Sequence, residues 1–456
     1  MSKTDLLIKS FLSLALALLV AAGFGCQNAT TTSAPAKVAT TPAREFEEIP
    51  NDPFFAKFHP KYAPRPAGLL LKKGDRLAII GDSITEQKQY SRIMETYLTV
   101  CVPELQITAR QYGWSGERAD GFLRRMTNDC LRFEPTIATT CYGMNDHQYK
   151  PYEEAIGAAY RKYSTAIVQS FKAHGVRVVQ GSPGPVGKMP GWVRSAAGTV
   201  EDLNLSLCQH RNIGVEIAQA EQVGFADVFW PMFTGGFTGR KNYGPDYAIA
   251  GKDGVHPGWA GQTVMAYAFL KSLGVDGDIG TITVDLKSGA AKTSTGHEVL
   301  SGKTGEWQIK SSRYPYCAIG SLSNDNSIRS AMTLIPFNQD LNRLMLVAKG
   351  GKASGYKVTW GEETKTYSSA QLAKGVNLAA DFSVNPFTEA FKKVDAAVGA
   401  KQNYETTQIK NIFHGAEGKA DMEAAVKKTE AERAPLAEAI KTAFVPVTHT
   451  IRLEAN

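Results

Sequence analysis

Two short segments of the chain carry side chains that suit nucleophilic hydrolysis. Ser83 follows an apolar run in "LAIIGDSITEQ", and His256 lies three residues after Asp253 in "DGVHPG". A serine hydroxyl is a weak nucleophile until a base removes its proton. In a turn, this spacing brings the Asp253 carboxylate to Nδ1 of His256, so that Nε2 faces Ser83. The spacing therefore predicts a nucleophile, a general base and an acid that fixes the tautomer of the base.

Acyl transfer also needs hydrogen-bond donors for the oxyanion that forms on the substrate. Gly116, in "GWSGERA", offers a backbone N–H that a substrate can approach closely, and Asn145, in "CYGMND", offers a side-chain amide. The N–H of Ser83 is the third expected donor. Ser83 also precedes a helical pattern, and the free amides at the start of a helix favour negative charge.

These residues also have ordinary structural interpretations. Ser83 could be a turn or helix-capping serine. His147, which follows "GMND" directly, is the alternative base and could line the site, but it has no acid at the triad spacing. We expect Asp82 to order the turn rather than to react, and Asp146 to be structural.

Aromatic side chains could stack on sugar rings, although packing in the core or rim is the commoner role of such residues. Those considered are Trp114, Tyr142, Trp192, Trp230 and Trp259. The candidate substrate contacts are Asp82, Trp114, His147 and Trp230. Residues 229–247, "FWPMFTGGFTGRKNYGPDY", are predicted to form a substrate loop, because long loops near a site are usually functional.

The surrounding sequence alternates between strand and helix patterns. Strands are predicted at 76–80, 106–113, 136–143, 176–183 and 225–230, and helices at 89–102, 118–133, 158–175, 203–222 and 258–274. This alternation predicts a parallel sheet with helices on both faces. Sites in such sheets form beyond the carboxyl ends of the strands, which is where the four motifs fall.

The motifs "GDSIT", "GWSGE", "GMND" and "DGVHPG" occur in this order and resemble blocks I, II, III and V of the SGNH (GDSL-type) hydrolases. The resemblance covers residues 67–278. It implies a flavodoxin-like, three-layer α/β/α domain with a parallel sheet. It also implies ester hydrolysis by Ser83, Gly116, Asn145 and His256, with Asp253 as the acid of the triad. The motifs are similar in detail to those of secreted bacterial members, many of which are linked to polysaccharide deacetylation.

The chain departs from the family pattern at two places. Gln111 and Tyr112 precede Gly113 where block II often begins with Asn, which weakens a supporting hydrogen bond but leaves Gly116 intact. Gln87 and Lys88 follow Glu86 where many members have Gly. These changes alter the rim of the site and therefore bear on substrate choice.

The pattern changes near residue 278. We expect an accessory region over 279–456, made of a small antiparallel sheet at 279–380, helices at 385–443 around "FHGAEGK" and a final strand at 446–453. This smaller β region and helical hairpin could bind glycan, dimerise or brace the hydrolase domain.

The N-terminus has the pattern of a targeting segment. Residues 1–26 have two lysines before the apolar run "SFLSLALALLVAAGF", which is typical of a secretory signal. The "GFGC" end is similar to a bacterial lipobox, so Cys26 is either a lipidated residue or part of an ordinary cleaved signal. Residues 27–66 are predicted to be a linker and lead-in. The protein is thus expected to be exported, to the periplasm, the medium or a lipid anchor on the envelope.

Composition excludes several classes of function. The net charge of +7 is modest and scattered, so we expect no nucleic-acid partner, and any membrane contact would come through the N-terminal anchor alone. No CxxC pair or HExxH motif is present, and we predict no metal and no cofactor. There is no GxSxG elbow or dinucleotide fingerprint. Of the five cysteines after Cys26, an odd number, at least one stays unpaired in the monomer, and one disulfide is possible in an exported protein.

The sequence therefore predicts an exported serine esterase that removes acetyl groups from a carbohydrate or a small-molecule ester. A lipase or lysophospholipase of the same family is the nearest alternative. A non-catalytic glycan-binding lipoprotein is the alternative from another class.

Overall fold

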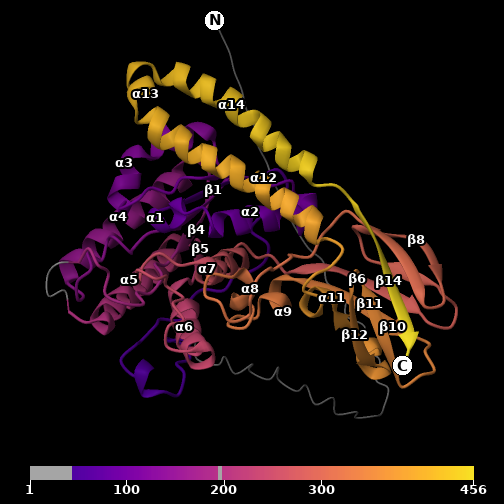
Figure 1. The fold of residues 1–456 in the computed structure, drawn as a ribbon. Helices are drawn as coiled ribbons and strands as arrows, with labels where there is room; N and C mark the ends of the chain where they lie inside the picture. The colour runs from indigo at the N-terminus through magenta and orange to yellow at the C-terminus, as the bar shows by residue number, and fades with distance from the viewer. Residues whose placement is uncertain (1–43, 194–197) are drawn as a thin grey trace, which may run out of the picture. The chain divides into compact units, whose positions relative to one another are not determined.

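The computed structural model describes residues 44–193 and 198–456 (Figure 1). The predicted signal at 1–26, Cys26 and the first part of the linker lie outside the described residues. Residues Arg44–Asn456 form one compact unit. The C-terminal region therefore packs with the hydrolase region, and the two are described together.

A five-stranded parallel sheet forms the centre of the hydrolase region. Its strands are β1 (Arg76–Gly81), β2 (Thr108–Gln111), β3 (Ile137–Cys141), β4 (Arg177–Gly181) and β5 (Gly224–Ala226). They lie in the order β2-β1-β3-β4-β5, which is the flavodoxin-like order. The predicted α/β fold class is thus confirmed.

Helices cover both faces of this sheet. They are α2 (Tyr90–Val100), α3 (Ala119–Asp129), α4 (Glu154–Ala173), α5 (Val200–Glu221) and α7 (Trp259–Ser272). Alternate residues of a strand point to opposite faces. Leu77 and Ile79 of β1 accordingly share an apolar cluster with α2 and α7, whereas Ala78 and Ile80 share another with α3 and α4. This alternation produces the three layers.

The predicted substrate loop at 229–247 is wrong for most of its length, because residues Phe229–Tyr243 form helix α6. The glycines that suggested a loop allow close packing instead. A Cβ on Gly236 would lie 2.6 Å from Ile249 Cγ2, and one on Gly239 would lie 2.5 Å from the ring of Tyr247. The predicted strand at 225–230 correspondingly ends early, at Ala226.

The lead-in covers the aromatic face of α6. Phe55, in the short 3₁₀ helix η1 (Pro53–Phe55), and Phe58 are fully buried and pack against Phe233. The lead-in is therefore anchored to the core by these two rings, although most of its residues are exposed or half-buried.

The C-terminal region contains two sheets instead of one small antiparallel sheet. The first has the order β13-β10-β6-β7, from Val376–Asn377, Arg343–Lys349, Asp278–Asp285 and Ala291–Thr293. Its central pair, β6 and β10, is parallel. A parallel pair needs a long crossover, and the chain between these strands, 286–342, supplies it. That crossover includes helices α8 (Ile328–Ala331) and α9 (Phe337–Leu341).

The second sheet is antiparallel throughout and has the order β12-β11-β14-β9-β8. Its strands span Glu363–Ser368, Gly355–Trp360, Val447–Ala455, Glu306–Ser311 and His297–Lys303. The predicted last strand is thus central to this sheet. Short helices α10 (Ser369–Lys374) and α11 (Leu378–Asp381) follow β12.

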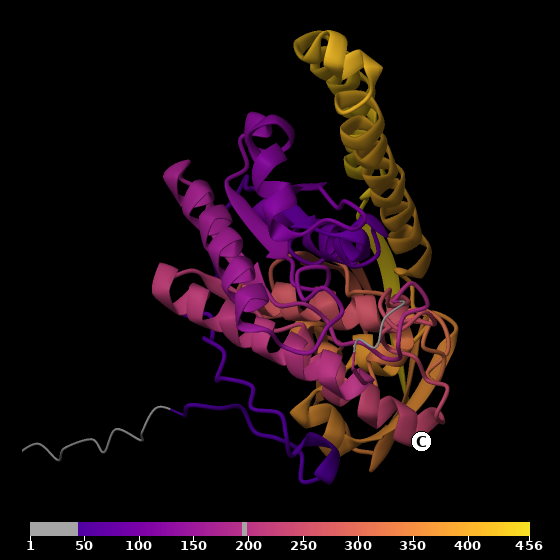
Figure 2. The same cartoon turned by 90° about the vertical axis from the view of Figure 1, so that its left-hand side faces the viewer.

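A helical hairpin joins the two parts. It runs from α12 (Thr388–Thr406) through the π-helix η4 (Thr407–Phe413) and α13 (Ala416–Ala420) into α14 (Met422–Ala443), shown in gold in Figures 1 and 2. Its first arm lies against the hydrolase region, where Arg92 of α2 pairs with Asp395 and Ser91 donates a hydrogen bond to Gln402.

Five cysteines lie in the part of the chain that the structure describes, and all are free and buried: Cys101, Cys130, Cys141, Cys208 and Cys317. Among the described residues, no helix is both long and apolar enough to cross a membrane.

A buried histidine, His449, makes the stability of the fold depend on pH. His449 accepts a hydrogen bond from Trp360 Nε1 at 3.0 Å through Nδ1 and contacts Ser311 Oγ through Nε2. Burial, with a smaller effect of nearby His297, lowers the pKa of His449 to about 3. Protonation at Nδ1 would remove the acceptor for Trp360, so the folded state disfavours the charged form.

We therefore expect His449 to destabilise the fold as the pH falls from about 6.5, where the unfolded histidine starts to bind a proton, towards about 3. His449→Asn keeps an acceptor for Trp360 and removes the titration. The difference in unfolding free energy between the wild type and His449→Asn should shift by about 2 kcal/mol in favour of the variant between pH 7.5 and pH 5. Urea unfolding measures it, with the exposed His174→Asn as control. A constant difference would contradict the expectation.

Candidate active site

The nucleophile candidate lies where β1 meets the one-turn helix α1 (Ser83–Glu86). Asp82 caps this turn, because its Oδ1 accepts a hydrogen bond from Ile84 N at 2.9 Å. The turn lifts the Ser83 hydroxyl beyond the carboxyl end of the sheet, next to the point where the strand order reverses. α1 is a single turn, so any help for an oxyanion must come from individual amides rather than from a long helix dipole.

Ser83, His256 and Asp253 form one hydrogen-bonded line. His256 Nε2 lies 2.8 Å from Ser83 Oγ, and His256 Nδ1 lies 2.7 Å from Asp253 Oδ2. The other carboxylate oxygen of Asp253 accepts from the backbone N–H groups of Val255 and His256, each at 2.9 Å. Partial burial would raise the pKa of Asp253, but these hydrogen bonds outweigh it and hold the pKa below its ordinary value. Asp253 is thus kept as a carboxylate that orients the imidazole.

The loop after β2 presents Gly116 at the same edge of the sheet. Gly116 has φ +73°, a left-handed conformation that other residues adopt only with strain. It is exposed, and a Cβ built on it would meet nothing within 4 Å. The glycine is therefore required by its backbone conformation, and its main chain is open to a substrate.

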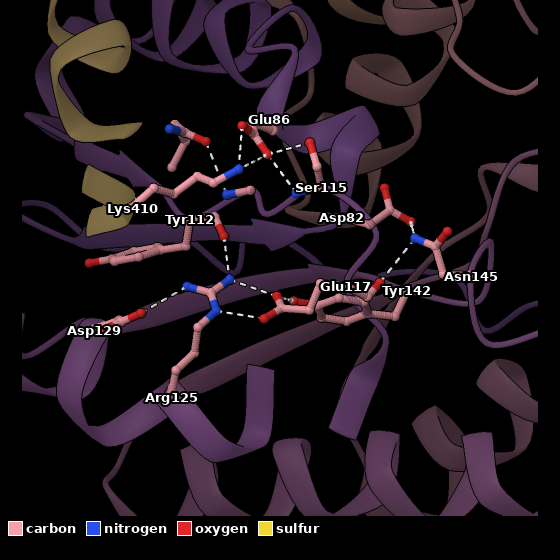
Figure 3. Close-up of polar contacts among 12 residues, drawn as sticks. Asp82, Glu86, Tyr112, Ser115, Glu117, Arg125, Asp129, Tyr142, Asn145 and Lys410 are labelled. Atoms are coloured by element: carbon pink, nitrogen blue, oxygen red, sulfur yellow. Dashed lines mark hydrogen bonds and ion pairs between the residues drawn. The ribbon is translucent and has the colours of Figure 1, made fainter. Parts of the chain in front are cut away.

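Asn145 follows β3 and points to the same place. Its Nδ2 donates to Glu117 O at 3.0 Å and makes a longer contact of 3.4 Å with Asp82 Oδ2, as Figure 3 shows. Burial, aided by the nearby Asp146 and Glu117 carboxylates, raises the pKa of Asp82 to about 7. The weaker of the two Asn145 contacts is the one that a substrate oxygen could replace.

A buried ion-pair network fixes the start of α3 beside Gly116. Arg125 donates to both carboxylate oxygens of Glu117 at 2.7 Å and to Tyr112 O at 2.7 Å. Tyr142 Oη donates to Glu117 Oε2 at 2.7 Å, and Arg125 also pairs with Asp129 (Figure 3). Because every charge is paired, this network holds the backbone around Gly116 without leaving a free buried charge.

The structure places the four candidate substrate-contacting residues in different surroundings. Asp82 lies at the site but acts in the turn. Trp230 is buried and packs on Phe55, away from the site. His147 is fully buried and hydrogen-bonded through Nδ1 to Met144 O, and burial, with nearby His210, lowers its pKa to about 3.

Trp114 lies beside the Gly116 loop, but charged groups occupy its surroundings. The Arg125 guanidinium is 5.0 Å and the Lys410 ammonium 5.1 Å from its ring, and His414 meets the ring edge-on at 4.9 Å. Trp114 is therefore better placed to hold these groups than to stack on a sugar.

Trp192 is an aromatic residue that lies beside His256. Its ring centroid is 5.8 Å from that of His256 and 5.9 Å from that of Tyr149, and 46% of the residue is exposed. Tyr149 Oη in turn contacts Asn145 Oδ1 at 3.3 Å. In the sequence Trp192 stands among glycine and proline residues with no motif around it, so nothing distinguished it from the other tryptophans.

A cavity of about 530 Å³ opens beside Gly116. Its lining is mainly polar and charged and includes Arg118, Asp120, Arg124, Asn128 and His414. A larger cavity of about 820 Å³ lies between β2 and the helical hairpin and includes none of the five predicted catalytic or oxyanion residues.

Comparison with known proteins bears on the family and the fold of the chain. Residues 79–264 match the GDSL-like lipase/acylhydrolase family. Comparison with curated proteins finds no match. A gut microbial diltiazem-metabolizing enzyme shares the fold, with a TM-score of 0.67, 21% identity and coverage of 86% of this chain and all of the other. An acetylxylan esterase from Geobacillus stearothermophilus is 22% identical over 45% of this chain and 97% of its own, with a TM-score of 0.37.

The chain contains an SGNH, or GDSL-type, hydrolase domain over residues 79–264. It is a hydrolase that acts on ester bonds. The predicted family and enzyme class are thereby confirmed.

The left-handed conformation of Gly116 leads us to predict that a substitution there lowers activity. Gly116→Ala places a Cβ in the left-handed region, so the main chain relaxes and its N–H moves away from the position that a substrate oxygen needs. We expect kcat on an acetyl ester to fall about 10- to 100-fold, as a misplaced donor would cause. The matched control is Gly175→Ala, which has φ +72° and equally open surroundings in a remote loop. Both variants should lose about 1 kcal/mol of stability, because each puts a Cβ in the left-handed region. Equal activity of the two variants would contradict the expectation.

Proposed function

We propose that the protein is an exported serine esterase that removes acetyl groups from a carbohydrate, with Ser83 as nucleophile, His256 as general base and Asp253 as the acid of the triad. The observation that carries the proposal is the continuous line from Asp253 through His256 to Ser83, with separations of 2.7 and 2.8 Å. A purely binding protein has no need of such a line.

In the first half of the reaction Ser83 Oγ attacks the carbonyl carbon of the ester while His256 Nε2 takes the hydroxyl proton. The Asp253 carboxylate stabilises the imidazolium that forms. The backbone N–H groups of Ser83 and Gly116 and the amide of Asn145 hold the oxyanion. Loss of one such donor typically costs about 3–4 kcal/mol of transition-state stabilisation.

Collapse of the tetrahedral intermediate breaks the bond to the leaving oxygen. His256 gives its proton to that oxygen, so that the alcohol leaves and an acetyl-Ser83 ester remains. A water molecule then gives a proton to His256 and attacks the ester. As the second intermediate collapses, His256 returns this proton to Ser83 Oγ, and acetic acid leaves and ionises to acetate. These residues complete the cycle with no other reagent than water.

Two features of the site favour a sugar-borne ester. Trp192 offers a half-exposed ring beside His256, and aromatic rings stack on the apolar faces of sugars. The cavity beside Gly116 is lined by charged and polar groups, whereas a long acyl chain needs apolar walls; of the proposed catalytic and oxyanion residues, Gly116 alone is in its lining. Export is proposed from the N-terminal sequence alone.

The acyl specificity is tested with p-nitrophenyl esters of increasing chain length. We expect the acetate to be cleaved with a kcat/KM at least about tenfold above that of the octanoate and laurate, because a polar cavity gives no binding free energy to added methylenes. Ser83→Ala is the blank and should lose at least about 10³-fold. A preference for laurate would move the substrate to lipids, and wild-type rates equal to the blank on every ester would favour the glycan-binding alternative.

The role of Trp192 is tested by separating sugar binding from chemistry. Trp192→Ala should raise KM about 5- to 20-fold on an acetylated xylo-oligosaccharide, since a stacking contact contributes about 1–2 kcal/mol. The same variant should leave kcat on p-nitrophenyl acetate within about twofold. Trp192→Phe keeps an aromatic face and should recover most of the affinity. An unchanged KM on the oligosaccharide would exclude Trp192 as a sugar contact.

A further inference from the structure

The first arm of the C-terminal hairpin carries four polar residues at a spacing of four. They are Gln402, Thr406, Lys410 and His414. Residues four apart lie on the same face of a helix. The arm is continuous from α12 into the π-helix η4, and each of the four residues contacts the hydrolase region. The contacts fall on both sides of the loop that carries Gly116 and on α1 beside it.

The first contact lies just before this loop. Gln111 at the end of β2 directs its Nε2 to Thr406 Oγ1 at 2.6 Å and, more weakly, to Gln402 O at 3.4 Å. Gln111 Oε1 then accepts a hydrogen bond from Gly113 N at 3.0 Å. Gln111 is one of the departures from the family pattern. The sequence predicts that this departure weakens a supporting hydrogen bond of the loop. In the structure Gln111 Oε1 supports the loop by accepting from Gly113 N, and Thr406 of the C-terminal arm holds the Gln111 side chain.

The last contact lies after the loop. His414 Nε2 lies 2.8 Å from Asp129 Oδ2, and Asp129 pairs with Arg125 at 3.2 Å. Arg125 in turn holds Glu117, the residue that follows Gly116.

The central contact reaches the loop through α1. Lys410 Nζ lies 2.8 and 2.9 Å from the two carboxylate oxygens of Glu86, three residues after Ser83. Glu86 Oε2 accepts from both the backbone N–H of Ser115, at 2.5 Å, and its hydroxyl, at 2.6 Å (Figure 3). One carboxylate thus joins the helix of the nucleophile to the residue before Gly116.

This junction is also tightly packed. A Cβ on Gly113 would lie 2.2 Å from Glu86 N, so the loop rests directly on the backbone of α1. Burial would raise the pKa of Glu86, but the hydrogen bonds from Lys410 and Ser115 outweigh it and keep the pKa below its ordinary value. Glu86 remains charged, and Lys410 is the cation that pairs with it.

We propose that Lys410 is a positioning residue for ester hydrolysis: it fixes Glu86, Glu86 holds the N–H and hydroxyl of Ser115, and Ser115 in turn sets the direction of the next N–H, that of Gly116, in the oxyanion hole. This inference rests on the proposed roles of Ser83 and Gly116. The C-terminal region then has a defined role, because the hairpin holds the loop of the oxyanion hole in position and does not itself bind the substrate. Without the ammonium group, Glu86 turns towards solvent and the Gly116 N–H loses its fixed direction.

The test compares Lys410→Met with Lys410→Arg in the full-length protein on p-nitrophenyl acetate. Lys410→Met should lower kcat about 10- to 100-fold and leave KM within about twofold, because the donor acts in the transition state. Lys410→Arg keeps the charge and should recover at least half of kcat. The matched control is Lys428→Met, which removes an exposed ion pair with Glu417 in the same hairpin and should leave kcat unchanged.

A double-mutant cycle with Glu86→Gln gives a second criterion. If both residues act through one contact, the double variant should lose little more kcat than the worse single variant. Thermal midpoints separate this effect from unfolding, and Lys410→Gln replaces Lys410→Met if the latter is unfolded at the assay temperature. Wild-type kcat in the folded Lys410 variant, or fully additive losses, would overturn the inference. Wild-type activity no higher than that of Ser83→Ala would instead contradict the proposed function.

Discussion

The hydrogen bond between His256 Nε2 and Ser83 Oγ, at 2.8 Å, is the contact on which the site depends. It joins two segments that are 173 residues apart, and the parallel sheet brings them to one edge. Three further sets of contacts fix the residues around this hydrogen bond. Asp82 caps the turn that carries Ser83, and the Asp253 carboxylate orients His256 from the other side. Glu86 then fixes the neighbouring loop to the same turn.

Much of the fold could be predicted from the sequence, because strands and helices alternate with clear periods. The predicted strands include all five strands of the central sheet; most are short apolar runs followed by a turn, whereas β2, with the sequence TARQ, is mostly polar. α6 was missed because its glycines indicated a loop, whereas they serve close packing against Tyr247 and Ile249. The parallel pair β6 and β10 was also missed, because local alternation reveals a strand but not the direction of its neighbour.

The site residues likewise fall into those that the sequence predicts and those that it does not. Ser83, Asp253, His256, Gly116 and Asn145 lie in short motifs; the structure joins the first three by hydrogen bonds and places Gly116 and Asn145 in the loops after the neighbouring strands β2 and β3. Lys410 had no such signal. It is 324 residues from Glu86 in the sequence and lies in a region rich in alanine, lysine and glutamate, where a lysine usually faces solvent. Trp192 was one tryptophan among six until the fold placed it beside His256.

The most direct test of the central claim is to react the protein with a fluorophosphonate, which phosphonylates an activated serine, and to map the adduct by peptide mass spectrometry. The account predicts a single adduct on Ser83 and a labelling rate at least about 10²-fold lower in His256→Ala, because the imidazole is the base that activates the hydroxyl. An adduct on another serine, or a wild-type labelling rate in His256→Ala, would contradict the assignment of Ser83 and His256 as nucleophile and base.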